Sequence, residues 1–137
     1  MTYYPDLAPY AYLPATVPAG VTARTVGWLD GSHPFAQGPA PAGFARRLGL
    51  LCRDQPRART RGIHRCGLAG LGGCGLEPVH VEIEGRQVLL GSAEVRVAGV
   101  DGAWLIAPTL VYHYVTAHAY LPPAAFVEAV TAARVVG

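Results

Sequence analysis

Apolar and polar residues alternate most clearly between residues 79 and 107. Val79 to Ile83 interleaves Val and Ile with His and Glu, and the tight-turn sequence Glu84-Gly85-Arg86 follows. The alternation resumes from Gln87 to Val97, and a second turn, Val100-Asp101-Gly102, precedes Ala103 to Ala107. A period of two bounded by turn residues is typical of β-strands, so these residues predict an antiparallel meander of three strands.

Three other segments repeat apolar residues at helical spacing, and each begins with or next to a proline that can start a helix. They are residues 41–53, 108–118 and 124–134. Residues 3–20 are rich in proline and tyrosine, which excludes a regular helix and predicts an extended arm across the body. Residues 22–29 read as one more strand.

These elements predict a single α+β domain over residues 1–137, in which two or three helices cover an antiparallel sheet of three to four strands. The chain is 51% hydrophobic, which argues against intrinsic disorder. No apolar run approaches the roughly 20 residues that span a bilayer, and the first residues lack the features of a secretory signal. We therefore expect a cytoplasmic protein without a membrane partner.

All basic residues are arginines, and the abundance of Ala, Gly and Pro is typical of a GC-rich bacterial genome. Seven arginines crowd into twenty residues: Arg46, Arg47, Arg53, Arg57, Arg59, Arg61 and Arg65. They form either a surface for phosphates or an acidic partner, or a solvated segment that pairs with the acidic residues of the later strands. The second interpretation is favoured, because no DNA- or RNA-binding motif accompanies the arginines, and this also argues against a nucleic-acid partner.

The residues that carry candidate chemistry are His64, Cys66 and Cys74, with a glycine-rich stretch between the two cysteines. Three cysteines are an odd number, and in a reducing compartment such spacing favours metal ligation over disulfides. Imidazole and thiolate are the ligands that Zn²⁺ prefers, in tetrahedral sets of four. The glycines Gly67, Gly70, Gly72 and Gly73 allow the tight loop that returns Cys74 to the same point. The alternative is that the cysteines are small buried hydrophobic residues.

A fourth ligand has to come from elsewhere in the chain. The candidates are His113, His118 and His80, with Cys52 as a reserve thiol. Positions 113 and 118 are about 140° apart around a regular helix, so we expect only one of them to reach the ion. His113, within Tyr112-His113-Tyr114, is favoured.

A site closed by four protein ligands would be structural, whereas three ligands and a water would give a metal-bound hydroxide at neutral pH. The second case needs a carboxylate to shuttle protons, and Glu94, on the polar face of the middle strand, is the candidate general base. The alternative for Glu94 is a surface strand residue paired with Arg96 or a loop arginine.

The chain also resembles an uncharacterised family of small bacterial proteins over nearly its whole length. The matching motifs are Tyr3-Tyr4-Pro5-Asp6-Leu7 with Pro9-Tyr10, Val26-Gly27-Trp28-Leu29-Asp30 with His33-Pro34, Arg61-Gly62 with His64-x-Cys66, Gly91-Ser92-Ala93-Glu94, and Ala107-Pro108-x-Leu110-x-Tyr112-His113-Tyr114-Val115 with His118, Pro122-Pro123 and Phe126. The family's pattern is similar to His-x-Cys-x-x-Cys, but Ala69 stands at the second cysteine and Cys74 follows five residues later. The resemblance implies one shared fold and a metal site, and no activity.

Three functional hypotheses follow. The leading one is a small zinc-binding protein with a structural site that acts as a binding or accessory module for a protein or small-molecule partner. The second is a zinc-dependent hydrolase or lyase with Glu94 as base. The third is a metal-free binding protein that uses the arginine cluster.

Overall fold

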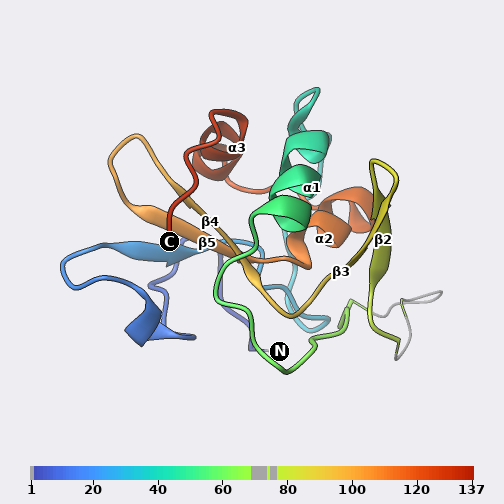
Figure 1. The fold of residues 1–137 in the computed structure, drawn as a ribbon, viewed down its shortest axis with the longest axis horizontal. Coiled ribbons are helices and arrows are strands. Elements are labelled where there is room, and N and C mark those ends of the chain that lie inside the picture. Colours follow the sequence, from blue (N-terminus) through green and yellow to red (C-terminus); the bar gives the residue numbers. More distant parts are fainter. Residues whose placement is uncertain (1, 69–73, 75–76) are drawn as a thin grey trace.

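The computed structural model of the chain describes residues 2–68, 74 and 77–137. It confirms the predicted α+β class (Figure 1). The elements in chain order are a 3₁₀ turn (Pro14–Thr16), β1 (Ala23–Thr25), α1 (Phe44–Asp54), β2 (His80–Ile83), β3 (Arg86–Leu89), β4 (Glu94–Ala98), β5 (Trp104–Pro108), α2 (Val111–His118) and α3 (Ala124–Thr131). No helix among these residues is long and apolar enough to cross a bilayer.

The strands form two sheets, where the sequence predicted one antiparallel meander. β5 lies between β4, to which it is antiparallel, and β1, to which it is parallel. β2 and β3 form a separate two-stranded hairpin. The three-stranded sheet is therefore mixed, because the arm and β1 reach β5 from the other end of the chain.

The predicted strand 87–97 is wrong as a single element, because the chain bends at Gly91 between β3 and β4. Gly91 has a φ of 103°, a left-handed conformation that side chains disfavour. A Cβ at this position would lie 2.2 Å from the carbonyl oxygen of His64, whose own N–H donates to the Gly91 carbonyl. The bend sends β3 to β2 and β4 to β5, and it brings residue 64 against the start of β4.

The three-stranded sheet is covered on both faces. Figure 1 shows α1, α2 and α3 on one side of β4 and β5 and the N-terminal arm on the other. Leu105 and Ala107 of β5 belong to the helix-side core, whereas Ile106 packs with Tyr10 and Trp28 beneath the arm. The alternation of strand side chains thus fills two cores.

The arm is fastened to the sheet by hydrogen bonds rather than lying loosely across it. Pro9 forms an antiparallel bridge with Arg24 of β1, and the Leu7 N–H donates to the Thr25 carbonyl. The Tyr120 hydroxyl lies 2.8 Å from both carboxylate oxygens of Asp6. These contacts cover the edge of β1, which would otherwise expose unpaired backbone groups.

Candidate metal centre

Two cysteines and two histidines converge beside α2. The ligand atoms of Cys66, Cys74, His113 and His118 all lie within 4.8 Å of one another. α2 supplies both histidines, and its position is fixed by Tyr114 and Val111, which are fully buried in the core. Cys66 lies in the irregular segment between α1 and β2 and is itself buried. The cluster therefore joins the middle of the chain to its last third.

The spacing within the cluster suits one tetrahedral ion. The Sγ atom of Cys74 lies 3.0 Å from Nε2 of His113 and 3.4 Å from Nε2 of His118. The Sγ atom of Cys66 lies 3.5 Å from Nε2 of His118. With Zn–S bonds of about 2.3 Å and Zn–N bonds of about 2.0 Å, tetrahedral geometry separates sulfur and nitrogen ligands by roughly 3.6 Å. A Cys₂His₂ donor set at this spacing fits zinc better than a hard, oxygen-preferring cation.

The protonation states within the cluster follow from burial. Burial raises the pKa of the Cys66 thiol to about 11, a hydrogen bond from the Leu68 backbone N–H lowers it, and the nearby Cys74 thiol raises it. Burial, and then the charge of His118, lower the pKa of His113. The imidazole is thus held in the neutral form that binds metals, whereas a metal would have to displace the thiol protons.

The expectation that residues 113 and 118 cannot both face one point is wrong. Their ring centroids are 5.0 Å apart, and both Nε2 atoms approach Cys74. His118 is the last residue of α2, and helical side chains lean toward the N-terminus, so its ring turns back over Tyr114 at 6.4 Å. The angle between the two Cα positions around the helix axis therefore does not predict how closely the two rings approach each other.

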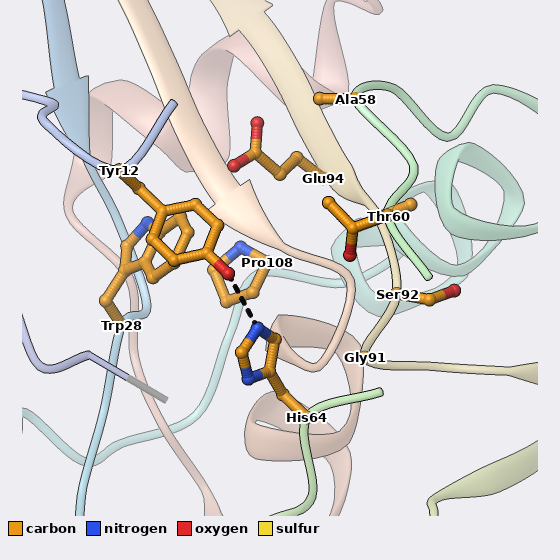
Figure 2. A pocket seen from close by; sticks show the side chains of 10 residues that line it. Tyr12, Trp28, Ala58, Thr60, His64, Gly91, Ser92, Glu94 and Pro108 are labelled. Carbon is orange, nitrogen blue, oxygen red and sulfur yellow. Dashed lines mark hydrogen bonds between the residues drawn. The ribbon is translucent and has the colours of Figure 1, made fainter. Parts of the chain in front are cut away.

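The structure brings together three of the four residues predicted as ligands, Cys66, Cys74 and His113, and puts His118 rather than His64 beside them. The Nε2 atom of His64 lies 2.9 Å from the Tyr12 hydroxyl. Figure 2 shows the His64 ring pointing to Tyr12 in a neighbouring pocket.

The other residues weighed as ligands lie outside the cluster. His80 is exposed on β2. Cys52 is buried in the helix-side core, where its thiol lies 3.7 Å from the Thr109 carbonyl oxygen. The predicted tight loop at Gly70, Gly72 and Gly73 lies outside the described residues.

Glu94 lies in the pocket with His64 but is not exposed. Its side chain is buried, so the alternative of a surface strand residue is wrong, although the pairing with Arg96 that this alternative included is confirmed. One carboxylate oxygen accepts hydrogen bonds from Arg96 at 2.7 and 2.9 Å, and the other accepts one from the Tyr10 hydroxyl at 2.7 Å. Arg96 is held in turn by the carbonyl and hydroxyl oxygens of Thr16.

The pocket itself is small. Its lining includes Tyr12, Trp28, Thr60, His64 and Glu94, and its volume of about 10 Å³ is close to that of one water molecule (Figure 2). Local sequence patterns do not predict that the arm lines this pocket, since Tyr12 and His64 are more than fifty residues apart in the chain.

Comparison with known proteins gives a family and no activity. A family model described as a domain of unknown function, DUF7919, matches residues 2–131. The chain belongs to this family. No curated protein and no solved structure matches it. The DUF7919 match spans the arm, the sheet and all four residues of the cluster, so the metal centre lies within the family domain.

Proposed function

We propose that Cys66, Cys74, His113 and His118 bind one Zn²⁺ ion in a closed, structural site, and that the protein acts as a binding or accessory module. One observation carries the proposal: the four ligand atoms lie within 4.8 Å of one another. Four protein ligands fill a tetrahedral site and leave no position for a reactive water. When bound, the ion would tie the segment after α1 to α2.

The catalytic alternative, with three protein ligands, a metal-bound water and Glu94 as base, has less support. Both carboxylate oxygens of Glu94 already accept hydrogen bonds, from Tyr10 and Arg96. A general base needs an oxygen that can approach the water whose proton it takes. Glu94 instead neutralises Arg96 inside the fold.

Elemental analysis and X-ray absorption of the purified protein test the proposal together. The expected result is one zinc per chain, with two sulfur and two nitrogen ligands at about 2.3 and 2.0 Å. A content below about a tenth of an equivalent would exclude a metal site, since structural zinc in small domains binds tightly. One oxygen ligand in place of a nitrogen would instead favour the open, catalytic site.

A further inference from the structure

The positive charges of the arginines between residues 59 and 65 are not neutralised by carboxylates of the described residues. Six of the eleven arginines form ion pairs with carboxylates: Arg24, Arg46, Arg53, Arg86, Arg96 and Arg134. Within the described residues, which include all nine Asp and Glu, no carboxylate pairs with Arg59, Arg61 or Arg65. The pairing that the sequence favoured thus holds for Arg46 with Glu84 but not for these three.

The backbone of this segment is fixed against β4 and the bend before it. Arg57 exchanges two backbone hydrogen bonds with Glu94, at 2.7 and 2.8 Å. The Thr60 N–H donates to the Ser92 carbonyl at 2.7 Å, and the His64 N–H donates to Gly91 at 2.9 Å. The segment then ends at Cys66 in the metal centre. Its side chains are therefore presented from a defined backbone rather than from a loose loop.

Buried and exposed residues are interspersed along the segment. Thr60, His64 and Cys66 are wholly or partly buried, whereas the residues between them are exposed. The exposed residues at odd positions are Arg59, Arg61, Ile63 and Arg65, which together are called the arginine face below. The segment is irregular and bends at Arg61, and the Arg59 guanidinium also donates to the Ser92 hydroxyl at 3.0 Å. Ile63 is 38% exposed and is one of three large apolar residues in the described chain that stand out into solvent.

We propose that the arginine face binds an acidic segment of a partner protein. The planar guanidinium of arginine pairs with a carboxylate through two hydrogen bonds, so the acidic side chains of a partner segment can neutralise the three arginines. Ile63, between Arg61 and Arg65, offers an apolar contact that a protein segment can cover. Single-stranded nucleic acid would require stacking aromatic rings, and the arginine face has none.

This inference rests on the proposed function, because it names a partner for the proposed binding module and relies on the metal centre to fix the end of the segment at Cys66. The surface itself can be tested without reference to the metal. The probe is a fluorescein-labelled peptide of 12 residues that alternates glutamate with serine and carries one central leucine. Anisotropy at low ionic strength measures its affinity for the full chain.

Two triple variants with equal charge separate this surface from charge in general. Arg59→Gln/Arg61→Gln/Arg65→Gln removes the three arginines of the arginine face, which pair with no carboxylate of the described residues. The matched control, Arg24→Gln/Arg46→Gln/Arg86→Gln, removes three arginines whose side chains are 43%, 65% and 66% exposed but pair with carboxylates. The first triple is expected to weaken peptide binding about tenfold and the control less than about twofold, because exposed ion pairs each contribute little and add over three contacts.

Three outcomes would overturn the proposal: no binding of the peptide by the unmodified chain at millimolar concentration, equal loss in both triples, or tighter binding of a 12-nucleotide single strand than of the peptide. Zinc content is measured on every sample. Peptide binding by zinc-free chain would contradict the metal proposal alone, and zinc without peptide binding would contradict the arginine face alone.

Discussion

Replacing His118 and His64 separately by glutamine tests which histidine completes the metal centre. The Nε2 atom of His118 lies 3.4 and 3.5 Å from the two thiols, whereas that of His64 lies 2.9 Å from the Tyr12 hydroxyl. His118→Gln is therefore expected to weaken zinc binding and His64→Gln to leave it unchanged. His113→Gln should behave like His118→Gln, because its Nε2 atom is 3.0 Å from Cys74.

The magnitude follows from the four ligands. Structural zinc sites contribute about 10–16 kcal/mol of apparent binding free energy, so one of four ligands accounts for roughly 2.5–4 kcal/mol, or about 10²–10³ in Kd. His64→Gln disturbs only a partly buried hydrogen bond and should cost about 1 kcal/mol of folding stability, with Kd unchanged within about twofold. Competition with a chromophoric chelator measures Kd, and urea unfolding with excess chelator measures metal-free stability. A larger loss of affinity in His64→Gln than in His118→Gln would refute the assignment.

Three further predictions concern groups around the site. Glu94→Gln should lower the free energy of unfolding by about 3–5 kcal/mol, because it leaves Arg96 charged, buried and unpaired; urea unfolding measures it. Tyr114→Phe should change the stability of the metal-free chain by less than about 0.5 kcal/mol, since the buried Tyr114 hydroxyl has no hydrogen-bond partner among the residues that the structure describes. Metal-free protein should lose stability as the pH falls from about 7.5 to 5.5. Burial lowers the pKa of His113 and His64 below the value of about 6.5 that they have in the unfolded chain, so the unfolded chain binds more protons. Chemical denaturation at each pH measures the free energy of unfolding.

The two substitutions have matched controls, and the pH series has an outcome that would contradict it. Glu128 forms an ion pair with Arg134 at the surface, so Glu128→Gln should cost less than about 1 kcal/mol. Tyr120 donates to Asp6, so Tyr120→Phe should cost about 1–3 kcal/mol, unlike Tyr114→Phe. For the pH series, stability that rises on acidification would contradict the sign of both histidine shifts.

Local patterns predicted the elements well wherever the chemistry of a few adjacent residues decides the structure. Pro123 precedes α3, and the alternation of residues 79–83 matches β2. The break at Gly91 was not predictable in this way. Alternation continues through it, and the glycine is needed only because the His64 carbonyl lies where a Cβ would be. Such a contact between distant residues leaves no periodic signal.

The candidate site shows the same division. Cysteine and histidine can be recognised as potential metal ligands from residue type alone, and the sequence predicts Cys66, Cys74 and His113 for that reason. His118 was a candidate, but the helical angle favoured His113 alone, because such angles describe Cα positions and not the reach of a side chain from the last turn. The burial of Glu94 was missed because a period of two gives the face of a strand, and not the arm that covers that face.

The metal centre also predicts how the fold responds when zinc is removed. Between Asp54 and His80 the described residues contain no helix or strand beyond the bridge at Arg57, so few backbone hydrogen bonds hold them. Ordering ten such residues costs about 10–20 kcal/mol in backbone entropy, and three or four hydrogen bonds contribute about 1 kcal/mol each. A chelator should therefore abolish hydrogen-exchange protection of the Thr60 and His64 amides while β4 and β5 stay protected, because the β4–β5 ladder does not involve the cluster. Unchanged protection at Thr60 and His64 without zinc would show that packing alone holds the segment, and with it the arginine face.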